Sequence, residues 1–155
     1  MPGQEKRLRR LQRLSELIRR KLDQAVAALA QAQRAQQEAR DALASVTQQF
    51  HDAIEEASTA LGNGAHAEQW RIRHAWQETL RTRVQAASAL LEARGGEVVE
   101  ARTRVLVANE DLQKLNALIQ RVRACQQLED NRLERRAEDA TYAALAALSC
   151  KQAAS

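Results

Sequence analysis

The sequence predicts an all-α protein, a long antiparallel two-helix coiled-coil hairpin in which the second helix is longer than the first. Three observations support this fold class. The 155 residues are dominated by helix-forming Ala, Leu, Gln, Arg and Glu, and the only proline is Pro2, ahead of any element. Apolar residues recur with a seven-residue period on both sides of a short glycine-containing segment. One Phe, one Tyr and two Trp are too few for an ordinary globular core.

The first helix is expected over about residues 5–60. A heptad that starts at Leu8 places apolar side chains at fourteen of its sixteen a and d positions through Ala60. The two polar exceptions are Ser15 and Gln36. Such a long apolar seam is typical of a coiled coil.

A turn is expected at about residues 61–65, where Gly62, Asn63 and Gly64 follow one another. Glycine and asparagine tolerate positive φ and end helices. The second helix is expected over about 66–148, with the apolar seam continuing through Gly95-Gly96 without a skip. The pair is therefore interpreted as a weak point in one continuous helix.

The turn sets an antiparallel register in which the numbers of facing residues add to about 130. Large side chains then face small ones in most layers, as Leu29 faces Ala101, and Gln36 faces Arg94 in one polar layer. Trp70 falls on the seam over Ala60, which favours a packing role.

Beyond about residue 126 the second helix has no partner in this register, and its a and d positions become polar. We expect an unpaired tail, which is marginally stable alone. One face of it carries an apolar stripe that suits insertion into another protein; a frayed, alanine-rich helix is the alternative. The stripe consists of Ala137, Thr141, Ala144, Leu145 and Leu148.

Two other features suggest binding surfaces. Residues 1–21 carry eight basic and two acidic side chains, so this run is either a solvated face or a surface for an acidic partner. Near the turn, Ile72 and Trp76 lie off the seam and four residues apart; exposed aromatic residues are enriched at binding hot spots. Trp76 lying flat along its own helix is the alternative.

The sequence predicts no enzyme, cofactor or metal site. Phosphate-binding glycine motifs are absent, and His51, His66 and His74 lack metal-ligand spacing. Cys125 and Cys150 are too far apart along one helix for a disulfide, which fits a reducing cytosolic setting. No apolar run is long enough for a membrane span, and no signal peptide is visible. Nucleic-acid binding is not expected, because aromatic residues do not alternate with the basic ones.

The basic start from Lys6 to Leu11, the mid-chain turn and the charged run Leu133–Asp139 resemble the central stalk proteins of type III secretion systems, the YscO/FliJ-like family. The resemblance covers nearly the whole chain, and the Ala- and Arg-rich composition favours the bacterial virulence (injectisome) branch over the flagellar one.

The resemblance implies a non-enzymatic stalk in the cytoplasm, peripheral to the inner-membrane export apparatus. Its terminal end would sit in the hexameric secretion ATPase, and its turn would reach the cytosolic ring of the export gate; secretion chaperones are further possible partners. The gate-binding set would be Trp70, Ile72 and Trp76. The ATPase-binding set would be Arg7, Arg9, Arg10, Arg13, Arg132, Arg135, Arg136 and Glu138.

A different class of function stays open: a coiled-coil adaptor or escort, for secretion chaperones or another cytosolic complex, that holds its partners without affecting ATP turnover. A third hypothesis, a nucleic-acid-binding helical protein, would show binding that weakens steeply with salt.

Overall fold

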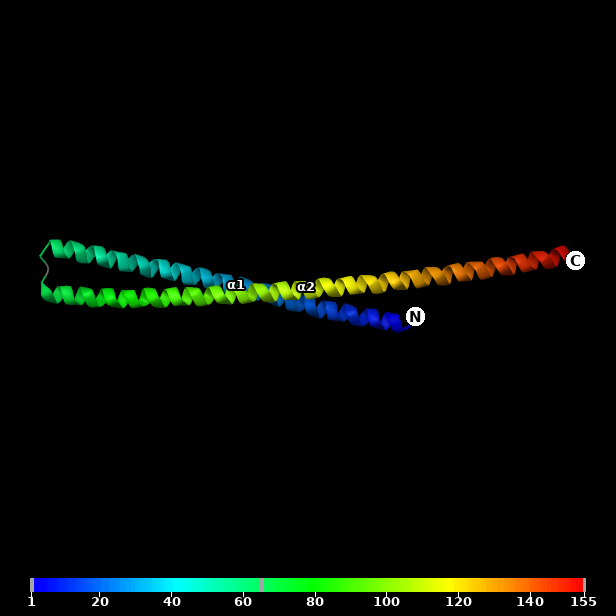
Figure 1. Cartoon of the computed structure of the whole chain (residues 1–155), viewed down its shortest axis with the longest axis horizontal. Helices are drawn as coiled ribbons and strands as arrows, with labels where there is room; N and C mark the ends of the chain where they lie inside the picture. Colours follow the sequence, from blue (N-terminus) through cyan, green and yellow to red (C-terminus); the bar gives the residue numbers. More distant parts are fainter. Residues whose placement is uncertain (1, 65, 155) are drawn as a thin grey trace. The chain divides into compact units, whose positions relative to one another are not determined.

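The computed structural model describes residues 2–64 and 66–154. It contains two helices, α1 (Pro2–Gly62) and α2 (Ala67–Ala154), and no strand within the described residues (Figure 1). The predicted all-α helical hairpin is confirmed, and α2, with 88 residues, is longer than α1, with 61. No helix formed by the described residues is long and apolar enough to cross a membrane.

The chain divides into two compact units, each built from parts of both helices. We call residues 1–20 and 109–155 the terminal unit, and residues 21–108 the turn unit. In the turn unit, α1 ends because Gly62, Asn63 and Gly64 follow its last seam residue. Gly64 has a φ of 77°, the left-handed conformation that favours glycine. Ala65, the last residue of the expected turn, lies outside the described residues.

The core of the turn unit is a seam of small and large apolar side chains. Leu80 is completely buried, and Ala39, Ala53, Val98 and Ala101 are nearly so. Every one of these residues occupies an a or d position of the predicted heptads, so the period found in the sequence is the one that packs.

Contacts across the turn unit show its register. The Arg73 guanidinium donates a hydrogen bond to the Glu56 carbonyl (2.9 Å), and the Gln77 amide donates to the Ala53 carbonyl (3.4 Å). The residue numbers of the two partners in each pair add to within about one of the predicted sum of 130.

The glycine pair in the turn unit lies inside a continuous helix, because α2 has no break between Ala67 and Ala154. The expected polar layer of Gln36 with Arg94 takes a different form. Arg94 bonds to both carboxylate oxygens of Glu97 on its own helix, at 3.0 and 2.9 Å. The Gln36 Nε2 atom lies 3.6 Å from where a Cβ on Gly95 would be, so it packs against the glycine.

The terminal unit has its own seam and register. Leu112, Leu115 and Ile119 are its buried core. The Ser15 hydroxyl donates to Asn116 Oδ1 at 3.3 Å. The Gln4 amide donates to Glu129 at 3.2 Å, beyond residue 126, where the tail was expected to begin. Every described residue from 130 to 154 is exposed, although α2 continues through them.

Candidate functional site

The basic start of α1 is a solvent-exposed surface of the terminal unit. Arg7, Arg9, Arg10 and Arg13 are all exposed and take part in no ion pair with another described residue. The paired part of this unit holds seven basic and two acidic residues over 1–20, and three of each over 109–129. These arginines therefore present a positive surface without intramolecular neutralisation.

The charged residues expected at the C-terminal end of the site lie further along α2. Arg132, Arg135, Arg136 and Glu138 all follow Glu129, the last residue of α2 bonded to α1. The structure thus puts the two halves of the predicted ATPase-binding set in one unit without bringing them into contact.

The tail is uncharged around the whole helix over residues 140–150, and not only along the predicted stripe. Between Asp139 and Lys151, eleven successive residues carry no charge on any face of the helix. Leu145 and Leu148 are each 57% exposed and Tyr142 is 71% exposed. Tyr142 lies off the stripe and was not picked out from the sequence. The gap in the charge pattern is the signal that points to it.

In the turn unit, the expected gate-binding residues form two separate groups. The Arg83 guanidinium lies over the Trp76 ring, 5.4 Å from its centroid, and the residue is 47% exposed. Ile72, one turn before it, is 71% exposed. This cation–π contact joins the indole to a residue seven positions further along the same helix. The alternative that Trp76 lies along its own helix is thus partly realised.

Trp70 belongs to the second group. Its ring stacks on His74, with centroids 5.2 Å apart and planes 1° apart, and the residue is 50% exposed. Trp70 thus stays half exposed at its seam position. Six residues turn a helix by about 600°, so Trp70 and Trp76 lie about 120° apart around α2.

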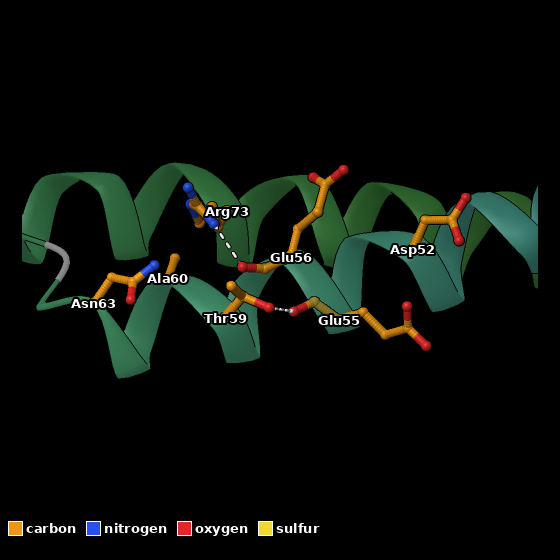
Figure 2. A pocket seen from close by; sticks show the side chains of 7 residues that line it. All are labelled: Asp52, Glu55, Glu56, Thr59, Ala60, Asn63 and Arg73. Atoms are coloured by element: carbon orange, nitrogen blue, oxygen red, sulfur yellow. Dashed lines mark hydrogen bonds between the residues drawn. The ribbon is translucent and has the colours of Figure 1, made fainter.

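Close to these residues, a shallow hollow is lined mainly by α1 (Figure 2). Asp52, Glu55 and Glu56 supply three carboxylates along it, and the Arg73 side chain reaches across from α2 to bond to the Glu56 backbone. Thr59 bonds back to the Glu55 carbonyl at 3.0 Å. Sequence reasoning missed this acidic face, although its residues recur at the three- and four-residue spacing of one helix face.

The described residues lack a cluster of metal-ligating side chains. They contain no group of three or more His, Cys, Asp or Glu side chains that could hold a metal ion. Cys125 and Cys150 are both exposed free thiols.

Comparison with known families identifies a match over most of the chain. The family model described as "Flagellar FliJ protein" matches residues 6–148, which include both helices, the turn and most of the tail. The chain belongs to the FliJ family. It is therefore a stalk-like protein of type III export. The FliJ family acts with components of the export apparatus. No curated protein and no solved structure matches the chain.

Within this FliJ family match, the matched range includes every residue of the two predicted binding sets. It ends at Leu148, inside the uncharged segment of the tail. The exposed surfaces described above thus lie within the matched range.

Proposed function

We propose that this FliJ-family protein is the non-enzymatic central stalk of a type III secretion system. Its terminal unit inserts into the hexameric secretion ATPase, and its turn unit contacts the cytosolic ring of the export gate. The ATPase-facing residues are the two arginine-rich sets of the terminal unit. The gate-facing residues are Ile72 and Trp76, with Trp70 as a second contact on another side of α2.

The single observation that carries the proposal is the exposed, uncharged segment of the tail. A helix that is apolar on only one side packs into a groove, whereas one that is apolar on all sides is normally enclosed. The eleven residues 140–150 span about 16 Å of helix, and all of them are exposed. A pore lined by several subunits would enclose such a segment, and the arginines that precede it would lie at the mouth of the pore.

A single stalk in a six-subunit ring contacts each subunit differently. Because a ligand shifts a conformational equilibrium only through differential binding, an asymmetric stalk favours different nucleotide states in different subunits. The chain itself would supply no chemistry to ATP hydrolysis. The proposed effect is on the turnover of the partner.

The test is to add the protein to its cognate ATPase and to measure ATP hydrolysis and hexamer formation. We expect the full chain to raise both. A chain cut after Glu129 keeps every contact between α1 and α2 that we describe and should lose the effect. If neither hydrolysis nor hexamer formation responds to the folded full chain, the stalk proposal is wrong.

The gate contact is tested separately. Replacing Trp76 and Ile72 by Ala should weaken binding to the gate ring by about tenfold or more, since exposed Trp residues are common binding hot spots. ATPase stimulation should stay unchanged. As a matched control, Leu90→Ala removes another exposed apolar side chain of the turn unit, 46% exposed. A loss of stimulation in the Trp76 variant would mean that the two surfaces are misassigned.

A second candidate is an adaptor or escort for secretion chaperones that does not change ATP turnover. It is favoured by one observation, an exposed apolar strip on α2 of the turn unit away from the seam. Val99 is 61%, Leu106 62% and Val107 51% exposed. An adaptor would bind its chaperone through this strip, and the ATPase assay above would show no response.

We further propose a cytoplasmic position, peripheral to the inner-membrane export apparatus, and the injectisome branch of the family. The composition rich in Ala and Arg supports this branch. Deletion in the source bacterium should then abolish secretion of virulence effectors and leave motility intact. The opposite pattern would place the protein in the flagellar branch.

A further inference from the structure

The basic residues of the terminal unit form no ion pair with another described residue. The described residues form two ion pairs, Arg81 with Glu78 and Arg94 with Glu97, and both lie in the turn unit. The turn unit holds ten basic and eleven acidic residues, so it is close to neutral. In the terminal unit the excess of positive charge lies in the paired part, because residues 130–155 carry four charges of each sign.

One groove in this paired part is lined by both helices. Gln12 and Arg19 come from α1, and Gln120 and Arg123 come from α2. The groove lies beside Ser15, where a small polar side chain replaces the apolar residue usual at a seam position. The seam is therefore less filled here than at the neighbouring layers.

The polar groups of the groove are mainly hydrogen-bond donors. The Ser15 hydroxyl donates to Asn116 Oδ1 at 3.3 Å, which leaves the Asn116 NH₂ group as a donor. Arg19 and Arg123 are exposed and have no ion-pair partner among the described residues. Guanidinium groups bind carboxylates in a planar, two-pronged arrangement, and amide NH₂ groups add further donors.

The groove is matched to a single negative charge. Glu16 also lines it, so the two arginines and this carboxylate leave a net charge of one positive unit. One carboxylate from outside would neutralise the site. No aromatic residue lines the groove for stacking on a nucleic-acid base.

We propose that this groove binds an Asp or Glu side chain on an acidic segment of a partner protein. The inference deepens the proposed function and rests on it, because it adds Arg19 and Arg123 to the partner-binding surface of the terminal unit. Neither residue belongs to the sets that the family resemblance implies. The groove would fix the register of the partner segment along the helix pair, while the tail supplies the apolar contact.

The test is a titration of the full chain with hexaglutamate, followed by NMR. We expect the side-chain NH₂ signals of Gln12, Asn116 and Gln120 to shift. The Arg19→Ala/Arg123→Ala variant should raise the Kd by about fivefold, from the loss of two partly solvated ionic contacts. Arg34→Ala/Arg40→Ala is the matched control, with the same charge change at exposed positions of the turn unit; its Kd should change by less than about twofold.

Three results would overturn the proposal that this groove binds an Asp or Glu side chain. The NH₂ signals could stay unchanged, the two double variants could weaken binding equally, or Arg19 and Arg123 could be needed only for binding to phosphatidylglycerol vesicles. Because the titration uses no ATPase, its failure is separate from failure of the stalk proposal. Binding of hexaglutamate in the groove without ATPase stimulation would refute the stalk proposal alone. ATPase stimulation without binding in the groove would refute the groove proposal alone.

Discussion

Replacing both Gly95 and Gly96 by Ala should stabilise the protein. Both glycines lie inside α2 with negative φ, so neither needs the left-handed conformation that only glycine adopts easily. A Cβ at Gly96 would meet no atom within 4 Å, and one at Gly95 would lie 3.6 Å from Gln36 Nε2, an ordinary van der Waals distance. Each Gly→Ala change in a helix interior is worth about 1 kcal/mol. The free energy of unfolding should therefore rise by about 2 kcal/mol.

Thermal unfolding followed by circular dichroism at 222 nm measures this change. For a chain of this size, about 2 kcal/mol corresponds to a rise in Tm of about 4–8 °C. Gly64→Ala is the matched control and should lower stability by about 1 kcal/mol, because φ is 77° there. If the Gly95/Gly96 variant is no more stable than the wild type, the glycines serve a close contact that this structure does not contain, and the reasoning is refuted.

Other predictions concern the seam and the tail. Leu80→Ala should cost about 2–5 kcal/mol of unfolding free energy, since Leu80 is fully buried, whereas Leu90→Ala at an exposed site should cost less than about 0.5 kcal/mol, measured by urea unfolding. Hydrogen exchange should be fastest for amides of residues 130–154 and should slow when the ATPase is added; unchanged rates would contradict enclosure of the tail. Cys150 should react with a thiol reagent in the free protein and be protected in the ATPase complex, and equal reactivity in both states would contradict insertion of the tail.

The fold could be predicted because a coiled coil repeats one local rule over many turns. The heptad starting at Leu8 assigned the seam, and the Gly62–Gly64 segment set the register, which contacts such as Gln77 to Ala53 confirm in the turn unit. The helix ends were less predictable. α1 starts at Pro2, because proline is well suited to the first position of a helix, and α2 extends to Ala154.

Individual side-chain partners could not be predicted in the same way. The Arg94 side chain is long and flexible, and it pairs with Glu97, three residues further along the same helix. Its seam position therefore did not determine its contact. Trp70 was assigned to the seam by its spacing, which did not predict that its ring stacks on His74 and that half of the residue stays exposed. The groove at Arg19 and Arg123 depends on how two helix flanks meet, which a single helical period does not specify.

The central claim is that the uncharged tail segment is enclosed by the ATPase, and one comparison tests it directly. Leu145→Glu places a charge inside the segment, whereas Leu128→Glu places the same charge at an equally exposed site of α2 before it; the two leucines are 57% and 59% exposed. Enclosure of an unpaired charge costs about 3 kcal/mol, or about 100-fold in affinity. In a titration of ATPase stimulation, the account predicts a large loss for Leu145→Glu and near-normal stimulation for Leu128→Glu. Equal stimulation by both variants would contradict it.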